Sequence, residues 1–328
     1  MLKETLILSG PDIEKLITMP SALRIAEQAF TAYGQGKIQM PAKIYLHLDK
    51  YQGDFRAMPA YIEGLEACGI KWVNVHPGNK HYGLPAVMAL IILSDPKTGF
   101  PLAVMDGTWI TNLRTGAAGG VAAKYLANKD SKIVSLIGCG AQARTQLMAL
   151  KELFKISEVR IYDRVNSQAA AFREKMSYSG LAMKNCASIK DCLEVCDIAV
   201  TTTPSRQPIV QSSWVKEGAH LNAIGADARG KQELDPAILK KAKVVVDDIT
   251  QATHSGEINV PLAKKIITRK NIHANLGDIL SGEKPGRTSK KEITVFDSTG
   301  LAILDIAMAH YVYRQARKNG SGKMFKFY

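Results

Sequence analysis

The sequence lacks the features that mark several large protein classes. Its 328 residues hold no apolar run approaching the roughly 20 residues that a membrane-spanning helix needs. It has neither an internal repeat nor a low-complexity linker, and it opens on a strand-like segment, 5–8, without a signal-peptide pattern. These absences argue against a helical membrane protein, a repeat protein and a secreted protein.

Cysteine and aromatic residues are also sparse. The five cysteines are odd in number and lack metal-ligand spacing, so we expect reduced thiols, a cytoplasmic location and no metal site. Aromatic residues make up 7% of the chain, and the net charge of +13 comes from basic residues that are scattered, apart from the tail at 314–326. No nucleic-acid motif accompanies them, so we expect neither a nucleic-acid nor a membrane partner, although basic groups at a cleft would attract phosphates and carboxylates.

The most informative segment that is present is 132–163. An apolar run leads into a glycine-rich turn, a helix-like segment follows, and a second apolar run ends at Asp163. This is the order of a dinucleotide-binding βαβ unit, in which Gly138 permits the turn, Gly140 admits a pyrophosphate and Ala143 keeps the helix close to the sheet. The N terminus of the helix would then offer N–H groups to the phosphates.

The acidic residue bears on the choice of cofactor. Asp163 can accept hydrogen bonds from ribose hydroxyls and would repel a 2′-phosphate, which favours NAD over NADP. Arg164 leaves the alternative open, because an adjacent guanidinium could pair with that phosphate. A glycine-rich turn formed for steric reasons alone is disfavoured, because the flanking segments are correct on both sides.

Hydrophobic patterning divides the chain into two kinds of segment. Residues 11–36 are typical of helices and 43–105 of strands, the last two of which should form a hairpin across a turn at 95–99. From residue 132 onward strands alternate with helices, the pattern of a doubly wound sheet. The strands of this second part are expected at 133–138, 158–163, 197–203, 219–225, 243–248 and 293–297.

We therefore predict an α/β protein with two domains. A Rossmann dinucleotide-binding domain, 128–299, is inserted into a discontinuous α+β substrate-binding domain formed by 1–127 and 300–328. A helix at 300–315 would pack back on the first domain, and small residues within 111–126 predict a closely packed helix.

Cationic side chains interrupt otherwise apolar patterns in the first domain. Lys43, Arg56 and Lys71 lie in or beside predicted strands, and Arg114 precedes a run of small residues. A single residue of this kind usually points to solvent. Several of them favour another interpretation, in which cations converge on one sheet face to bind a substrate carboxylate, arginine through its bidentate fork.

Polar residues follow the predicted strands of the second domain, where open α/β sheets bind their ligands. Asp227 comes just past one strand end, either as a loop-capping residue or as a catalytic carboxylate, and Lys231 follows on the same loop. Two other strand ends are expected beside the ribose and the nicotinamide. The residues there are Thr202, Thr203 and Pro204 at the first, and Ser298 and Thr299 at the second.

Short motifs with a recognisable order are spread along nearly the whole chain. They are Met40-Pro-Ala-Lys43, Arg56-Ala-Met-Pro59, Lys71-Trp-Val-Asn74, His76-Pro-Gly-Asn79, Leu113-Arg-Thr-Gly116, Ile137-Gly-Cys-Gly-Ala-Gln142, Ile224-Gly-Ala-Asp227 and Asp297-Ser-Thr-Gly300. In this order they resemble the ornithine cyclodeaminase/mu-crystallin family, most closely its archaeal alanine dehydrogenase branch.

The resemblance implies an NAD(P)-dependent homodimer whose discontinuous domain provides the dimer interface. It implies that Lys43, Lys71 and Arg114 hold a substrate carboxylate, and that Asp227 and Lys71 carry out proton transfer. Together with the residues derived above, the expected cofactor contacts are Arg114, Gly138, Gly140, Ala141, Gln142, Asp163, Arg164, Thr202, Thr203, Pro204, Asn222, Ala223, Ile224, Gly225, Lys231, Ser298 and Thr299.

One departure from the family pattern bears on the substrate. Cyclodeaminases of the family carry a glutamate where this chain has Arg56, and an acidic residue suits a substrate with a distal ammonium, whereas Arg56 does not. We therefore hypothesise a reversible, NAD-dependent oxidative deamination of L-alanine to pyruvate and ammonia, with Arg56 as a further carboxylate ligand. The alternatives are an ornithine cyclodeaminase, which forms proline and ammonia without net NADH, and a mu-crystallin-like ketimine reductase or ligand-binding protein.

Overall fold

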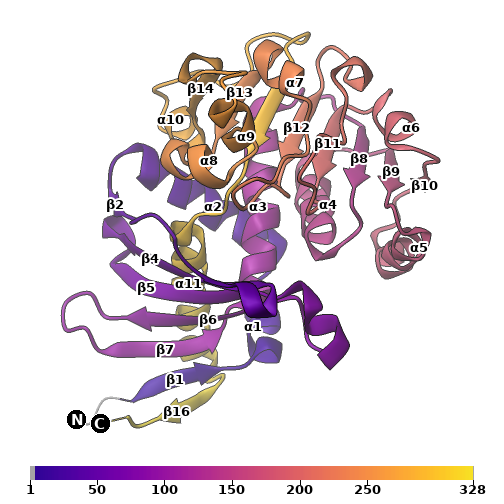
Figure 1. The fold of residues 1–328 in the computed structure, drawn as a ribbon. Helices are drawn as coiled ribbons and strands as arrows, with labels where there is room; N and C mark the ends of the chain where they lie inside the picture. Colours follow the sequence, from indigo (N-terminus) through magenta and orange to yellow (C-terminus); the bar gives the residue numbers. More distant parts are fainter. Residues whose placement is uncertain (1–3, 328) are drawn as a thin grey trace. The chain divides into compact units, whose positions relative to one another are not determined.

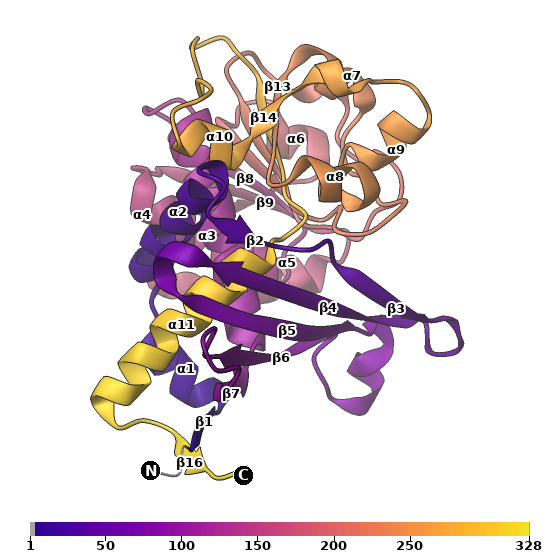
Figure 2. The same cartoon turned by 90° about the vertical axis from the view of Figure 1, so that its left-hand side faces the viewer.

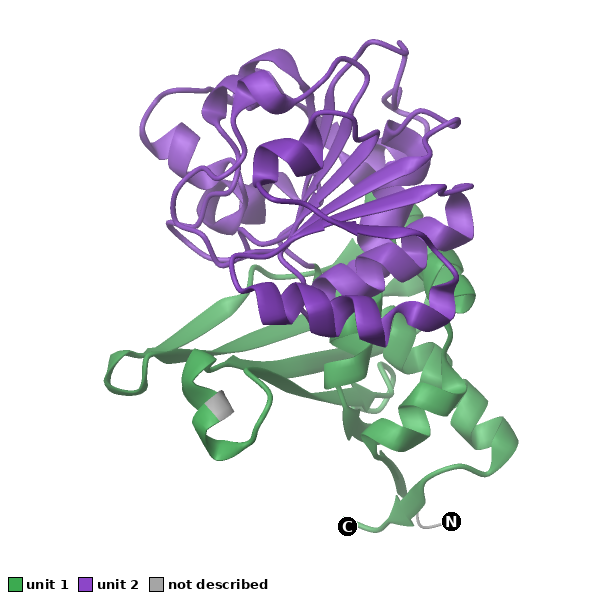
Figure 3. Ribbon diagram, turned by 90° about the vertical axis from the view of Figure 1, so that its right-hand side faces the viewer, with its two compact units in different colours: residues 1–114, 301–328 green, residues 115–300 purple. Residues whose placement is uncertain are grey.

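The computed structural model describes residues 4–327. The chain forms two compact units, unit 1 (1–114 and 301–328) and unit 2 (115–300) (Figure 3). The fold is α/β, with a Rossmann-type unit inserted between the two segments of a discontinuous α+β unit. The sequence predicts the first domain boundary after residue 127, at the end of a helix. In the structure the boundary between the two units lies within that helix, α3 (Thr108–Leu126).

Unit 1 is built on an eight-stranded sheet with the order β16-β1-β7-β6-β5-β4-β2, and β3 pairs with β4 outside this path (Figure 1). The predicted hairpin is confirmed, since β6 pairs with β7 across a turn in which the Lys97 N–H donates to the Asp95 carboxylate at 3.0 Å. Strand β16 escapes prediction because a short exposed edge strand has no alternation to read. The strands are β1 (Thr5–Leu8), β2 (Ile38–Gln39), β3 (Ile44–Leu48), β4 (Gly53–Ile62), β5 (Ala67–Val75), β6 (Val87–Ser94), β7 (Pro101–Asp106) and β16 (Lys323–Phe325).

Alternation along β4 separates the two faces of this sheet. Arg56, Met58, Ala60 and Ile62 are buried and the residues between them are more exposed, so their side chains share the inner face. The long helix α11 packs against β4, β5 and β6, and it corresponds to the helix predicted at 300–315 (Figure 2). The helices of unit 1 are α1 (Gly10–Leu16), α2 (Met19–Gly34) and α11 (Ala302–Asn319).

Unit 2 is a doubly wound domain. Its eight-stranded sheet has the order β10-β9-β8-β11-β12-β15-β13-β14, and its strand pairs are parallel. The winding changes direction between β8 and β11, the kind of switch point at which open sheets bind ligands. The six predicted strands are confirmed; the edge strands β10 and β14 are additional. The strands are β8 (Ile133–Ile137), β9 (Glu158–Tyr162), β10 (Met183–Asn185), β11 (Ile198–Thr201), β12 (His220–Ala223), β13 (Lys243–Val246), β14 (Ile272–Asn275) and β15 (Thr294–Asp297).

The closely packed helix that the small residues predict is α3. A Cβ added to Gly116 would lie 2.5 Å from the carbonyl carbon of Thr145 in α4, a backbone contact that leaves room only for glycine. No helix within residues 4–327 is long and apolar enough to cross a membrane. The other helices of unit 2 are α4 (Ala141–Leu153), α5 (Asn166–Lys175), α6 (Ile189–Leu193), α7 (Pro236–Lys241), α8 (Ile249–Ser255), α9 (Asn259–Ala263) and α10 (Leu276–Leu280).

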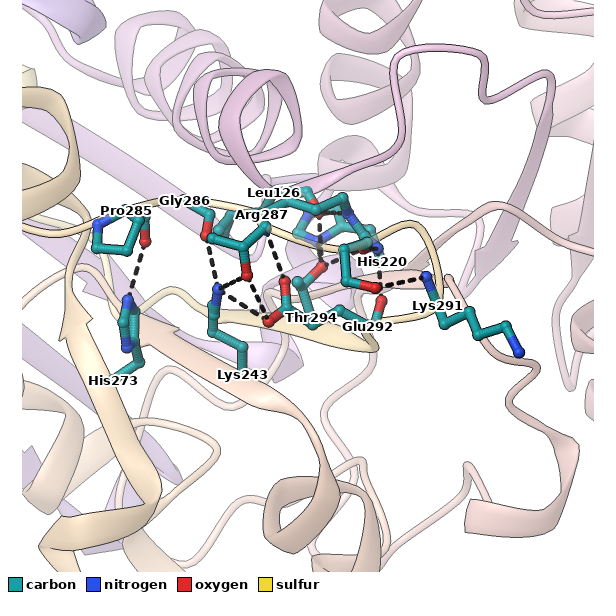
Figure 4. Close-up of polar contacts among 12 residues, drawn as sticks. Leu126, His220, Lys243, His273, Pro285, Gly286, Arg287, Lys291, Glu292 and Thr294 are labelled. Atoms are coloured by element: carbon teal, nitrogen blue, oxygen red, sulfur yellow. Dashed lines mark hydrogen bonds and ion pairs between the residues drawn. The ribbon is translucent and has the colours of Figure 1, made fainter.

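A long connection returns the chain from α10 to β15, which lies inside the sheet although it is the last strand of unit 2. Arg287 anchors this connection, because its Nε donates to the Leu126 carbonyl at 2.6 Å and a terminal nitrogen donates to the Thr294 hydroxyl at 3.1 Å (Figure 4). Lys243 pairs with Glu292 at 2.8 Å between Nζ and Oε1. Since Leu126 ends α3, the guanidinium also satisfies a carbonyl that the helix leaves without a partner.

Candidate active site

The glycine loop after β8 turns sharply and opens in front of α4. Gly138 has a φ of +91°, a left-handed conformation that favours glycine, and its N–H donates to the Tyr162 carbonyl at 2.9 Å. A Cβ added to Gly140 would meet no atom within 4 Å, so the space beside the loop is open. Gly140 is also the N-cap of α4 and has no side chain to cap it, so the first N–H groups of the helix can bind a phosphate.

Asp163 lies beside this loop. One of its carboxylate oxygens accepts from the Cys139 N–H and the other from the Val165 N–H, each at 2.9 Å. Each oxygen has a second lone pair that can accept from a ribose hydroxyl. Arg164 follows and is exposed. The structure thus brings the glycine loop, the acidic residue and the neighbouring guanidinium to one end of the sheet; their contacts with a cofactor stay predictions.

A buried carboxylate that sequence reasoning missed joins the ends of β11 and β12. Glu233 accepts hydrogen bonds from the Thr201 hydroxyl, the Thr203 N–H and the Thr203 hydroxyl, all at 2.7 Å, and from the Gly225 N–H at 2.8 Å. Burial raises the pKa of Glu233. The Glu233 side chain therefore sets the conformation of both loops that are expected to face the cofactor. No local sequence pattern identifies Glu233, because its hydrogen-bond partners lie at the ends of β11 and β12.

The side chain of Asn222 is directed into unit 2. It is fully buried, its Nδ2 donates to the Gly119 carbonyl at 3.0 Å, and its Oδ1 lies 2.9 Å from His220 Nε2. Burial lowers the pKa of His220 to about 3, so the imidazole is neutral and its Nε2 donates to that oxygen. Ala223 and Ile224 are buried as well. A ligand at this strand end would therefore meet backbone groups.

A second buried acid holds the turn after β15. Asp247 accepts from the Thr299 N–H at 2.6 Å, the Thr299 hydroxyl at 2.9 Å and the Gly300 N–H at 2.7 Å. Ser298 and Thr299 are themselves almost fully buried. Three hydrogen bonds to one buried carboxylate therefore hold the turn that is expected near the nicotinamide. Asp247 is a further residue that sequence reasoning missed, because its partners lie at the end of another strand.

Asp227 lies on an accessible loop that follows β12. Lys231 Nζ is 2.6 Å from Asp227 Oδ1, and the side chains are 18% and 34% exposed, respectively. The structure thus brings together the two residues that the sequence placed on one loop. A partly exposed carboxylate can exchange protons with a bound substrate and with water, as a general base must.

In unit 1, Lys71 and Arg114 meet on one carboxylate of the last helix. Lys71 Nζ lies 2.8 Å from Asp305 Oδ2, and Arg114 Nε lies 3.1 Å from Asp305 Oδ1. Lys71 and Asp305 are fully buried, and Arg114 is 7% exposed. Burial lowers the pKa of Lys71 to about 7, the charges of Arg114 and Lys43 lower it as well, and Asp305 opposes them.

Asp305 is a third residue that sequence reasoning missed. It lies in the apolar helical run 301–308, where a lone charged residue is the signal that could have found it. Its partner Arg114 is 191 residues away along the chain. A contact of that separation depends on how α11 returns to the sheet, which no local pattern describes.

Arg56 faces the same side of the sheet as Lys71, because the residue opposite Lys71 is Met58, two positions along β4. The guanidinium is held by Asp54, at 2.7 Å from Nε to Oδ1 and 3.3 Å from a terminal nitrogen to Oδ2. Its carbon lies 5.2 Å from the centre of the Tyr45 ring. The orientation of Arg56 is therefore set within the strand pair β3–β4.

Comparisons with known proteins agree with this architecture. The model of the ornithine cyclodeaminase/mu-crystallin family matches residues 3–320. The alanine dehydrogenase of Archaeoglobus fulgidus is 54% identical over 327 residues, covering 99% of each chain. An archaeal alanine dehydrogenase dimer with bound NAD superposes with a TM-score of 0.96 at 52% identity, covering 99% of this chain and 100% of that one. The Delta(1)-pyrroline-2-carboxylate reductase of Thermococcus litoralis, solved with NADH and L-proline, gives 0.95 at 42% identity, covering 97% and 99%. The chain therefore belongs to the ornithine cyclodeaminase/mu-crystallin family, as its motifs predict.

Proposed function

We propose that this chain is an NAD-dependent alanine dehydrogenase, which reversibly converts L-alanine, NAD⁺ and water to pyruvate, ammonia and NADH. The observation that carries the proposal is the pair of buried cations, Lys71 and Arg114, on a single carboxylate, Asp305. With Lys71 protonated, this group has a net positive charge that suits the carboxylate of an amino acid. The 54% identity to the Archaeoglobus fulgidus alanine dehydrogenase supports alanine as that amino acid.

The residues of unit 2 fit NAD. The open space at Gly140 and the uncapped N terminus of α4 suit a pyrophosphate, and Asp163 suits a ribose hydroxyl. The turns set by Glu233 and Asp247 lie at strand ends, where such cofactors are bound. When bound, NAD takes up the hydride that leaves the α-carbon of the substrate.

The proton chemistry falls to this chain's own residues. Lys43, Arg56 and Arg114 hold the carboxylate so that one C–H bond keeps a fixed orientation. Asp227 accepts a proton from the substrate ammonium and passes it to water; after the imino acid has formed, the regenerated carboxylate accepts a proton from the water molecule that adds to the imine carbon. Lys71, with its pKa near 7, can exchange a proton as the adduct releases ammonia.

The first test is absorbance at the reduced-nicotinamide band, with purified protein, NAD and a panel of L-amino acids at alkaline pH. A rise with alanine supports the proposal. A rise with proline alone would favour the imine-reducing activity of the Thermococcus litoralis relative. Proline formed from ornithine without NADH accumulation would establish a cyclodeaminase and overturn the proposal.

The preference for NAD can be tested at Asp163. We expect Asp163→Asn to raise kcat/KM with NADP relative to NAD by about 10-fold or more, because the charge that repels a 2′-phosphate is removed. The amide oxygen still accepts from the Cys139 N–H, so the loop should keep its shape. Adding Arg164→Ala to Asp163→Asn should reverse part of the gain in kcat/KM with NADP, because the guanidinium that could pair with the 2′-phosphate is then absent. An unchanged ratio would mean that Asp163 does not face the ribose.

We also propose that the enzyme is a homodimer whose subunits meet on the outer face of the unit 1 sheet. Trp72, Leu90 and Ile92 are 42%, 53% and 41% exposed, and Trp72 lies opposite Leu90 on adjacent strands. Ile44 extends the patch and is 65% exposed. An apolar sheet face of this kind marks an interaction site. The dimeric state of the archaeal relative supports a second copy of this chain as the partner.

A charge on this face should separate the subunits. We expect Leu90→Glu to convert the dimer to a monomer in sedimentation equilibrium at micromolar concentration, because an unpaired carboxylate would be buried in the interface. Val165→Glu is the matched control, since Val165 is 48% exposed but lies in unit 2. A Leu90→Glu protein that stays dimeric would place the interface elsewhere.

We place the enzyme in the cytoplasm. The five cysteines are all unpaired thiols, which a reducing compartment preserves. The partners of the enzyme are then a small amino acid or 2-oxo acid and a second copy of the chain.

A further inference from the structure

We propose that Asp305 is a positioning residue of the carboxylate-binding site: from α11 it holds the Lys71 ammonium and the Arg114 guanidinium side by side and lets Lys71 carry its charge while buried. The inference deepens the proposed function and rests on it for its kinetic consequence. It assigns a role to a residue that the proposed reaction does not otherwise use.

The geometry is that of a shared counter-ion. The two carboxylate oxygens of Asp305 contact different cations, Lys71 Nζ at 2.8 Å and Arg114 Nε at 3.1 Å. A planar carboxylate used in this way sets both the spacing and the direction of the two cations. Because Arg114 contacts Asp305 through Nε, its terminal nitrogens form the fork that can bind a substrate carboxylate. Asp305 also lies in the first turn of α11, where the helix dipole favours an acidic residue.

The surroundings of Lys71 are rich in positive charge. The residues opposite it on the neighbouring strands are apolar, Met58 on β4 and Ile91 on β6. The charged groups on the elements packed around it are Asp305 on α11, Arg114 on α3, Lys43 before β3 and, farther along β4, Arg56 with its partner Asp54. Asp305 supplies the negative charge in direct contact with the Lys71 ammonium.

Removal of the Asp305 charge should lower the pKa of Lys71. The pKa of Lys71 is lowered to about 7, chiefly by burial and also by the charges of Arg114 and Lys43, while the charge of Asp305 opposes them. In Asp305→Asn, the interactions that lower the pKa remain and the opposing charge is lost. Lys71 should therefore give up its proton at a lower pH than in the wild type.

The direct test is an NMR titration of the Lys71 side chain in protein labelled at lysine, with the resonance assigned from Lys71→Met. We expect the midpoint to fall by about 1–3 pH units in Asp305→Asn and to stay close to the wild type in Asp305→Glu, which keeps the charge. A midpoint that is unchanged or higher in Asp305→Asn would overturn the proposal. Because no substrate is added, the result does not depend on whether alanine is the substrate.

The kinetic test uses kcat/KM for alanine as a function of pH. If Lys71 must be neutral to take up a proton, the ascending limb should move to lower pH in Asp305→Asn, and KM should rise about 10-fold as the cations lose their shared anchor. NADH affinity should change little, because all the residues expected to bind NADH except Arg114 lie in unit 2. A loss of activity with an unmoved limb would indicate a purely structural role and would overturn the proposal.

The wild-type protein supplies a test that needs no variant. If Asp305 is in contact with the Lys71 ammonium, its carboxyl carbon resonance should shift with the same midpoint as Lys71. Different midpoints would overturn the proposal even if Asp305→Asn does not fold.

Discussion

Replacement of Asp227 by asparagine is expected to lower kcat for alanine oxidation by about 10²- to 10⁴-fold, the usual contribution of a general base. The amide has nearly the same size but cannot accept a proton from the substrate. NADH should still bind, because the glycine loop and Asp163 are untouched. Steady-state kinetics with NAD and alanine measure the first effect, and titration of NADH fluorescence measures the second.

Asp278→Asn is the matched control for this experiment. It makes the same change of charge in the first turn of α10, on the same unit, and should leave the kinetics unchanged. Full activity in Asp227→Asn would remove Asp227 from the mechanism. Loss of NADH binding together with activity would assign Asp227 to cofactor binding, together with Lys231, whose Nζ lies 2.6 Å from Asp227 Oδ1.

Exchange of Lys71 for methionine is expected to lower kcat/KM for alanine by about 10³-fold, comparable to the loss of one partner of a buried charge pair. Methionine fills the buried space but carries neither charge nor proton. Lys71→Arg separates the two roles, because arginine stays protonated at every accessible pH. We expect it to keep more of the affinity for alanine than methionine does, and to lose kcat.

Two measurements keep this result interpretable. The melting temperature and NADH affinity of each Lys71 variant show whether the protein is folded, and Lys50→Met, on an exposed turn of unit 1, controls for the loss of a lysine. Wild-type kcat in Lys71→Arg would mean that Lys71 only binds the carboxylate. Wild-type kcat/KM in Lys71→Met would show that Lys71 neither binds the substrate carboxylate nor transfers a proton, and the proposed function would lose its main structural support.

Local sequence signals account for most of the elements. The strand, glycine turn and helix at 132–163 could be read from the chain because each depends on neighbours within a few residues. The same holds for the hairpin across 95–99, whose turn residues bond to one another. The three-residue strands β10 and β16 could not be read, since so short an edge strand exists only through its pairing with a neighbour.

The residues of the candidate site also fall into those that the sequence predicts and those that it does not. The cations Lys71 and Arg114 stood out as charges in apolar or small-residue segments, and Asp163 stood out by its place after the second strand. The carboxylates that hold the loops and the cations, Glu233 and Asp305, were missed. Each bonds to residues on other elements, and burial of a polar side chain becomes tolerable only when those partners are in place.

The sequence by itself determined the order of the elements, the dinucleotide-binding loop and the family, because periodicity, turn chemistry and motif order are properties of neighbouring residues. Only the tertiary structure decided that β15 lies inside the sheet, that Glu233 joins two strand ends and that Asp305 holds Lys71 and Arg114. The physical reason is the length of chain between the partners, 191 residues for Arg114 and Asp305. Over such separations a contact is set by how the chain packs, and burial then determines which charges must be paired.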